Sequence, residues 1–475
     1  MPPSFLHGVE TFEVQKGPRP IRQVRTAVVF LVGTAPMGPL NVPTLVLGER
    51  DAAQFGPESP DFTIPQAIND IFNEGYGTIV VMNVCDPDTH KTAVTNELKT
   101  FNNQNKLVLD HPHISSLVVK NQAGSTTYVL NTDYTRDLVT GEIERVVGGA
   151  ITANQQISAS YSYVDPTEVE NADVIGTTTV GGQRTGLQGS KDVYSLFGFK
   201  PKLFLAPVFS TQNSVSAEMN SLAHSLKAMS LVDAPVGTTF SQAITGRGPS
   251  GTINFNISSE RAILCFPHIK TFNKTSNAEE LRPLSSSAAG VICRTDNEFG
   301  YWYSPSNKEI RSALGAEIPL TSDITDAQSE TNVLNENGIV TVFNSFGSGI
   351  RLWGNRSSAW PANTNPETFI SIRRTKDVLH ESIEFSMLQF LDRPINDALI
   401  DAIVASCNAF MRTLIGRGAL IDGFVSYDPN KNPPTEIALG HLLFDVTFMP
   451  PTPAERITFE SFLDINLLAS LGTAA

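Results

Sequence analysis

The fold is decided by the stretch from Gly338 to Thr458, which opens with Gly338-Ile-Val-Thr-Val-Phe-Asn-Ser-Phe-Gly-Ser-Gly-Ile-Arg-Leu-Trp-Gly-Asn-Arg356. Apolar residues at 339–343 and 350–353 flank a Gly-rich turn, which predicts a hairpin. After Ile372-Arg-Arg-Thr-Lys-Asp377 come two amphipathic segments of helical length, and the stretch closes with Gly440-His-Leu-Leu-Phe-Asp-Val-Thr-Phe-Met-Pro-Pro-Thr-Pro-Ala-Glu-Arg-Ile-Thr458. This order predicts a packed α/β unit that ends in a strand-like arm.

The two amphipathic segments each carry apolar side chains at the spacing of a helix face. In the first, residues 376–391, these are Leu379, Ile383, Met387 and Phe390. In the second they are Leu399, Ile403, Cys407, Phe410 and Leu414. The break at Asp392-Arg-Pro394 makes Asp392 a candidate N-cap for the second helix, which we expect to end at Gly416 or Gly418. Alternation over 442–448 predicts a strand after it.

Upstream, strands alternate with helices, which predicts a mixed, partly parallel sheet. The expected helices are 63–73 and 214–230, and the expected strands are 26–33, 43–48, 78–84, 201–207, 231–236 and 261–267. From 86 to 190 the texture changes to short Val/Ile/Thr/Tyr-rich runs between turn signals, which predicts an inserted all-β domain. The fold class is therefore α/β (α+β), with a mixed sheet built from N-terminal and C-terminal parts of the chain.

These patterns divide the chain into six segments. We expect an N-terminal arm, a first part of the α/β body, an inserted β-rich domain, a middle α/β domain, a C-terminal core domain and a C-terminal arm. Their boundaries are 1–20, 21–85, 86–190, 191–335, 336–452 and 453–475.

Both ends of the chain contain an isolated extended segment with alternating apolar residues. These residues are Val9, Phe12 and Val14 near the N-terminus and Ile457, Phe459, Phe462 and Leu463 near the C-terminus. A lone extended segment cannot satisfy its own main-chain polar groups, so it pairs with a sheet edge in its own subunit or in another. For the N-terminal segment, a frayed terminus is an equal alternative.

Bulk composition excludes several classes of protein. A net charge of −14 argues against a general nucleic-acid binder, which normally carries a basic face. The N-terminus lacks the basic start and apolar core of a signal peptide, and no run of 18 apolar residues occurs, so we expect no membrane insertion. The four cysteines lie far apart in apolar contexts, which predicts buried, reduced thiols.

Candidate chemical motifs are weak. Asp110-His-Pro-His113 brings two imidazoles and a carboxylate together, but a surface turn is the favoured interpretation because no further ligands are evident. Gly246-Arg-Gly248 and Gly347-Ser-Gly349 lack the spacing of a phosphate-binding loop, and Gly-x-Ser-x-Gly is absent. Tyr301-Trp-Tyr303 has no basic neighbours, which favours core or interface. We therefore predict no catalytic, cofactor-binding or metal-binding residues, and no enzyme.

Several ordered pieces resemble the tail sheath proteins of contractile phages and related contractile injection systems. The resemblance begins at Ile21–Gly33 and Gly38–Thr44 and includes Arg294–Pro305. Its strongest pieces are Leu334–Thr341, Gly349-Ile-Arg-Leu-Trp-Gly354, Ile372-Arg-Arg-Thr375, Arg417-Gly-Ala-Leu-Ile421 and Pro453-Ala-Glu-Arg-Ile457. The stretch 86–190 does not carry the match, which suits a variable outer domain.

The resemblance implies a helical homo-oligomer around a tail tube that contracts by rearranging its subunits and drives the tube through the host envelope to deliver a genome. The implied partners are other copies of the chain, the tail tube protein, and the baseplate and tail terminator proteins. No cofactor and no direct nucleic-acid contact are implied. The implied location is the virion, after assembly in the host bacterial cytoplasm. By analogy the terminal segments would be exchanged between subunits.

Arg373, Arg374 and Lys376 form a basic cluster that could meet an acidic tube surface, with a solvated helix start as the alternative. A positive cluster sits poorly at a helix N-terminus, which favours a partner. Three other readings remain open for the whole chain: a bacteriocin or secretion-type sheath, an α/β enzyme with an inserted β-domain, and a static capsid or tube subunit. The enzyme reading predicts a pocket with convergent polar groups and perturbed ionisable residues.

Overall fold

A computed structural model describes residues 20–75, 77–273, 276–344, 347 and 349–470. Its body is built on a nine-stranded sheet with the order β15-β18-β17-β12-β11-β10-β1-β3-β2. The strands from β17 to β3 pair in parallel, and β18, β15 and β2 add antiparallel edges. The strands are β1 (Val28–Gly33), β2 (Thr44–Val46), β3 (Thr78–Asn83), β10 (Leu203–Leu205), β11 (Met229–Asp233), β12 (Ala262–Cys265), β15 (Lys308–Glu309), β17 (Ile339–Asn344) and β18 (Ile350–Trp353). The predicted mixed sheet and the predicted hairpin are confirmed.

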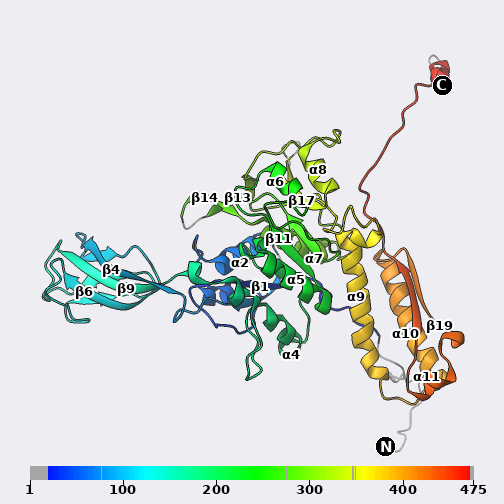
Figure 1. Cartoon of the computed structure of the whole chain (residues 1–475). Coiled ribbons are helices and arrows are strands. Elements are labelled where there is room, and N and C mark those ends of the chain that lie inside the picture. The colour runs from blue at the N-terminus through cyan, green and yellow to red at the C-terminus, as the bar shows by residue number, and fades with distance from the viewer. Residues whose placement is uncertain (1–19, 76, 274–275, 345–346, 348, 471–475) are drawn as a thin grey trace, which may run out of the picture.

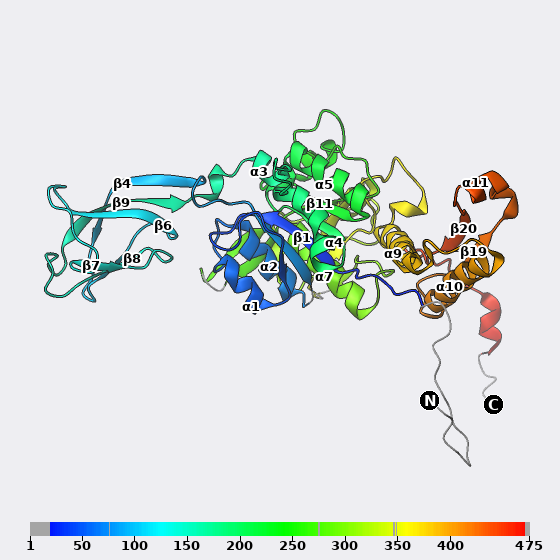
Figure 2. The same ribbon diagram turned by 90° about the horizontal axis from the view of Figure 1, so that it is seen from below.

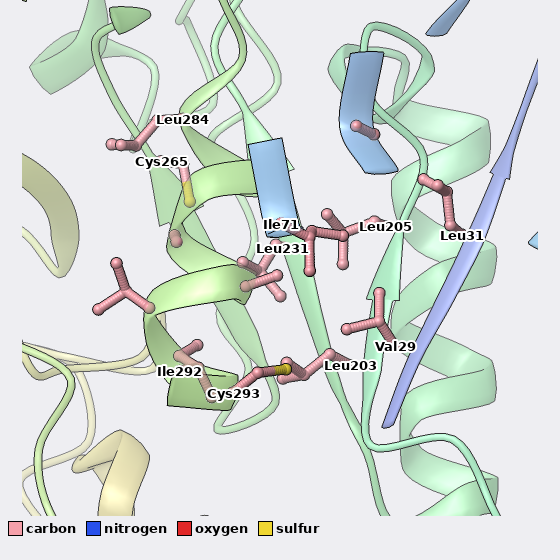
Figure 3. Close-up of a cluster of buried hydrophobic side chains, with 14 of the residues drawn as sticks. Val29, Leu31, Ile71, Leu203, Leu205, Leu231, Cys265, Leu284, Ile292 and Cys293 are labelled. Atoms are coloured by element: carbon pink, nitrogen blue, oxygen red, sulfur yellow. The ribbon is translucent and has the colours of Figure 1, made fainter. Parts of the chain in front are cut away.

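Helices cover both faces of this sheet (Figure 1). Alternate residues of β1 point to opposite sides: Val29 and Leu31 pack with α2 and α7, whereas Val28 and Phe30 pack with α5. Figure 3 shows the first of these clusters, in which strand side chains meet Ile71 of α2 and Ile292 of α7. The helices of the body are α1 (Glu49–Ala52), α2 (Thr63–Asn73), α3 (Asn171–Ile175), α4 (Val193–Phe197), α5 (Asn213–Leu226), α6 (Phe240–Thr245), α7 (Leu284–Glu298) and α8 (Glu330–Glu336).

A separate group of strands lies to one side of the body, at the opposite end from the C-terminal helices (Figures 1 and 2). It has its own hydrophobic cluster, which includes Phe101, Ile143 and Ile157. One sheet has the order β4-β9-β6 and the other β5-β8-β7. The strands are β4 (Lys91–Thr100), β5 (Lys106–Val108), β6 (Ile114–Asn121), β7 (Tyr134–Arg136), β8 (Glu142–Arg145) and β9 (Gln156–Val164).

The strands end at Val164, so the expectation of β structure as far as 190 is wrong for its last part. Residues 166–192 form short helical turns, α3 among them, that pack on the body. Val174 and Leu187 are fully buried in the same cluster as β1 and α5. Single apolar residues such as these carry no periodicity, so their burial could not be predicted from the sequence pattern.

The C-terminal part forms a layer at the other end of the body. It contains α9 (Ile370–Met387), α10 (Asp397–Gly416), β19 (Asp422–Tyr427), α11 (Pro434–Ala438) and β20 (Phe444–Met449), with β19 antiparallel to β20. The predicted apolar face of α10 is buried and meets Leu379 of α9 and Val425 of β19. A small sheet of β13 (Ile269–Asn273), β14 (Ala278–Arg282) and β16 (Ala313–Ala316) flanks the body.

Two helix starts differ from the predictions. α9 begins at Ile370 rather than at Lys376, which places Arg373 and Arg374 inside it. The N-cap of α10 is Asn396, whose side chain accepts the N–H of Leu399, and not Asp392. Asp392 has a φ of 59°, outside the helical region, so the chain stays irregular from there to Asn396.

Among the described helices, α10 is the one long and apolar enough to cross a membrane, with a mean hydropathy of 1.5. One such helix is weak evidence for a membrane span, because a core helix passes the same test. The face from Leu399 to Leu414 packs within the subunit. The expectation of no membrane insertion stays a prediction.

Candidate functional site

The described part of the C-terminal arm, residues 453–470, runs away from the body (Figure 1). Up to Asp464 it contains no helix or strand, and a short turn at Ile465–Ser470 follows. Its apolar side chains face solvent: Ile457 is 70% exposed, Phe459 90% and Phe462 85%. Exposed apolar side chains gathered on one segment are typical of an interaction site. Val9, Phe12 and Val14 of the N-terminal segment lie outside the described residues.

The hairpin of β19 and β20 has one edge that α10 closes. The side chain of Asn408 on α10 accepts the N–H of Val425 and donates to its carbonyl, both at 2.8 Å. The main-chain groups of Val425 therefore point away from β20. Its cross-strand partner, Val446, must point away from β19 in turn, because opposed residues of an antiparallel pair share the same bonding state.

The outer edge of β20 is consequently open at Val446 and, by alternation, at Phe444 and Phe448. In the described part of the chain no side chain bonds the N–H of Val446. Exposed apolar side chains lie on and beside β20, with Val446 37% exposed, Met449 39% and Leu443 53%. An open edge beside exposed apolar side chains is a template for another strand. This edge and the C-terminal arm both belong to the C-terminal part of the chain.

The basic cluster predicted to face a tube is mostly interior. Arg374 donates to both carboxylate oxygens of Asp296 at 2.6 and 2.7 Å, and Arg373 donates to Asp377 at 2.6 Å. Arg373 and Arg374 are only 7% and 5% exposed. Lys376 is half-buried and pairs with Glu367. The prediction is therefore corrected for the two arginines: their charges are neutralised within the subunit, and their side chains are not available to a partner.

These arginines belong to a network that fixes α9 to the body. Asp377 accepts two hydrogen bonds from Arg261, at 2.6 and 2.8 Å, beside the bond from Arg373. Burial alone would raise the pKa of Asp377, but the two guanidinium groups hold it below its usual value. Further along the helix, Glu381 pairs with Lys202, whose pKa burial lowers. The network ties α9 to the residues that precede β10 and β12 and to α7.

A groove with a volume of about 880 Å³ separates the body from the start of the arm. Pro451 to Glu455 form one wall, and Trp302, Tyr303, Trp353 and Trp360 contribute the aromatic part of the other. Tyr301, in contrast, is buried, so the aromatic run is partly core and partly surface. Glu455 crosses from the arm to Arg356 of the body, with a 2.7 Å contact between Oε2 and Nη2.

Other motifs that could carry chemistry have structural roles here. His111 stacks on Tyr163 with ring centroids 3.8 Å apart, and the described residues contain no metal-binding cluster. Arg247 in the Gly246-Arg-Gly248 turn donates to four main-chain carbonyls. Burial raises the pKa of Asp70 to about 7 and that of Asp233 above its usual value, but neither residue lines the groove.

The four cysteines are free and buried, as predicted. Burial raises the thiol pKa of Cys85 and Cys293 to about 12 and of Cys407 to about 11, which disfavours the reactive thiolate.

Comparison with known proteins identifies the family to which this chain belongs. A tail sheath protein of Burkholderia phage BcepMu is 48% identical over 473 residues, which cover 99% of each chain. The chain belongs to the phage tail sheath protein family. Residues 182–358 match the family described as phage tail sheath protein central domain, and 363–463 match the phage tail sheath C-terminal domain. Residues 87–173, which include the separate β strands, match a family of unknown function.

A more distant tail sheath protein matches in sequence, and a solved helical sheath matches in fold. The tail sheath protein of Escherichia phage P2 is 25% identical over 304 residues, covering 64% of this chain and 73% of that one. The helical sheath of the anti-feeding prophage, solved in its contracted state, has the same fold, with a TM-score of 0.59 at 16% identity, covering 97% and 100% of the two chains. This chain is thus a sheath subunit, and its arm and the β20 edge are candidates for its assembly sites.

Proposed function

We propose that this tail sheath subunit polymerises head to tail into a helical tube through strand exchange, with the C-terminal arm of one copy added to the open edge of β20 in another. The observation that carries this proposal is that one chain has both an unpaired extended arm and an unpaired strand edge. A contact between two different surfaces of identical subunits gives an open helical assembly when its rotation does not close a ring. Main-chain hydrogen bonds then hold neighbours together.

The arm has the length for this role. The segment from Arg456 to Asp464 is extended, and a fully extended chain of that length spans roughly 30 Å. That reach is comparable to the width of a neighbouring domain. Val9, Phe12 and Val14 are proposed for a second arm of the same kind at the N-terminus.

Contraction is proposed as a change in how rigid subunits pack, with the arms as the links that persist. The ion pairs between α9 and the body keep the C-terminal layer and the sheet together while subunits turn. The extended lattice would be kinetically trapped, because its subunits pack less well than in the contracted lattice but are separated from it by a barrier. Its release would push the tail tube through the host envelope for genome delivery, without a nucleotide.

The proposed partners are the tail tube, baseplate and terminator proteins. The outward face of α10 carries small or short side chains at Ala398, Asp401, Ala405 and Ala409, which allow close approach of a tail tube and take the place of Arg373 and Arg374 as the proposed contact. The β4–β9 strands lie at the opposite end and would form the outer surface (Figure 2). Baseplate and terminator proteins would meet the two ends of the tube, and assembly would take place in the host cytoplasm.

The phage role is favoured over a bacteriocin or secretion-type sheath because a relative that is 48% identical over 99% of the chain comes from a phage, whereas the injection-system sheath described above is 16% identical. The test is to delete Arg456 to Ala475 and to compare this variant with one that lacks only 471–475. We expect the longer deletion to give a folded monomer by circular dichroism and size-exclusion chromatography, and no tubes by negative-stain microscopy. Normal tubes from that variant would refute the role of the arm.

A further inference from the structure

We propose that Arg356 is a positioning residue for the C-terminal arm: it binds the Glu455 carboxylate in a site built by the body and so sets the direction in which the arm leaves. The inference rests on the proposed function of the arm as the link between copies. It adds that Arg356 and Glu455 set the direction of the C-terminal arm.

The body holds Arg356 in place without help from the arm. The guanidinium carbon lies 3.5 Å from the ring centroid of Phe369 and 4.2 Å from that of Trp360. Nη1 donates to the Thr368 hydroxyl at 2.8 Å, and the side chain is 11% exposed. A guanidinium that stacks on aromatic faces and is hydrogen-bonded at one corner has little freedom left to lose on binding a carboxylate.

The remaining edge of this guanidinium faces the arm. Nε donates to Oε1 of Glu455 at 3.1 Å and Nη2 donates to Oε2 at 2.7 Å. This two-point contact fixes the plane and the angle of the carboxylate, which a single point charge does not. Because Ile457 follows two residues later, fixing Glu455 also fixes the origin of the apolar segment.

Apolar packing and one ion pair together hold the root of the arm. Pro450 is buried, Pro451 and Pro453 are half-buried beside the groove of about 880 Å³, and Glu455 adds the two-point contact to Arg356. Pro451 and Pro453 stiffen the chain before the ion pair. From Arg456 to Leu463 no hydrogen bond or ion pair joins the arm to any other described residue. The ion pair at Glu455 is therefore the last side-chain contact between the arm and the body before the exposed apolar segment.

The consequence is that the arm of an unassembled subunit leaves the body in a defined direction before it meets a neighbour. A flexible root would let the arm sample many directions, most of which cannot reach the next β20 edge. Pre-organisation of this kind raises the rate and strength of association without adding a contact.

The test measures arm direction in single molecules of the full chain, at a dilution that prevents assembly. Dyes are attached at Leu463→Cys in the arm and Asp401→Cys on α10, and the distribution of energy-transfer efficiency is recorded. The native cysteines are buried and remain unlabelled. We expect one narrow peak, broadened by Glu455→Gln and by Arg356→Lys, which keeps the charge but loses the two-point geometry. Glu460→Gln is the matched control, because Glu460 lies in the same arm without an ion pair in the described structure and should leave the peak narrow.

An unchanged peak in Glu455→Gln would overturn the proposal. This readout is independent of polymerisation, so it separates the two ideas. If Glu455→Gln broadens the peak but the arm deletion still makes tubes, the exchange function fails and the positioning role stands. If the peak stays narrow and the arm deletion abolishes tubes, the positioning role fails and the exchange function stands.

Discussion

Asp377 is the residue on which the joint between α9 and the body depends most. Asp377 forms ion pairs with Arg261, which directly precedes β12, and with Arg373 of its own helix. Its side chain is 4% exposed. Replacement of Asp377 by Ala leaves the buried Arg261 without its carboxylate partner and removes one of the three carboxylates around Arg373. Because loss of one partner of a buried pair typically costs about 3–5 kcal/mol, we expect a decrease of that order in the free energy of unfolding. Urea unfolding of the dispersed subunit measures it.

The pH dependence of this effect has a definite sign. The pKa of Asp377 in the folded subunit lies below its value in the unfolded chain, so its stabilisation is fully present above the unfolded pKa of about 3.9. It is lost as the pH falls through the folded pKa. The difference between the wild type and Asp377→Ala should thus be constant near neutral pH and shrink in acid. Asp401→Ala, on the exposed face of α10, should change stability by no more than about 0.5 kcal/mol.

The sequence alone could not place Arg373 and Arg374. Their spacing and their position near a helix start were evident, but the poor fit of positive charge to a helix N-terminus was taken to favour a tube partner, whereas the carboxylates that pair with them lie within the subunit. These carboxylates are Asp296 for Arg374, and Glu367 and Asp377 for Arg373. Asp296 is far away along the chain, and local pattern carries no information on such a contact.

At the scale of the element, the open edge of β20 makes a sharp prediction. Val446→Pro removes the outward N–H at the centre of this edge, and proline is tolerated where the N–H faces solvent. We expect the variant to fold as a monomer with an unchanged circular dichroism spectrum. It should not form tubes in negative stain, because the incoming strand loses a main-chain bond and meets a proline ring.

Val446→Ala is the matched control, since it shortens the side chain and keeps the N–H. It should assemble, with at most a higher protein concentration required. Equal assembly of the proline and alanine variants would show that the neighbour does not pair with this edge.

Elements were predictable where periodicity was strong. The bounds of α2 and the buried face of α10 agree with their apolar spacing. α7 was missed, because Ser285 to Gly290 are small residues that are buried all round and leave no amphipathic stripe. β19 was missed as well, since Gly423 weakens its strand pattern and its stability comes from α10 and β20.

At the scale of the whole molecule, the β4–β9 strands should be removable. Lys91 and Val164 are cross-strand partners at the point where this unit joins the body, so a short Gly/Ser linker can connect the two ends. The unit has its own core, and its contacts with the second body cluster include Val164 and the ring of His113, which lies against Phe62. We expect a variant with 91–164 replaced by such a linker to fold and to form tubes of smaller outer diameter in negative stain.

A variant that keeps the unit but carries Ile143→Ala serves as the control, because it loosens that core alone. It should leave tube formation intact while lowering the thermal stability of the insert. If the deletion gave a folded subunit that did not polymerise, the unit would belong to the lattice contacts and not to the outer surface.

The straight, unpaired arm also has a mechanical consequence. A strand bonded along a sheet edge and pulled along its own length shares the load among all of its main-chain bonds at once. When the strand is pulled perpendicular to its length, these hydrogen bonds break one after another. With its root stiffened by prolines and anchored at Glu455, the arm would take tension lengthwise. Under the proposed pairing, each arm would transmit tension from one subunit to the next through all of its main-chain hydrogen bonds while the subunits rotate.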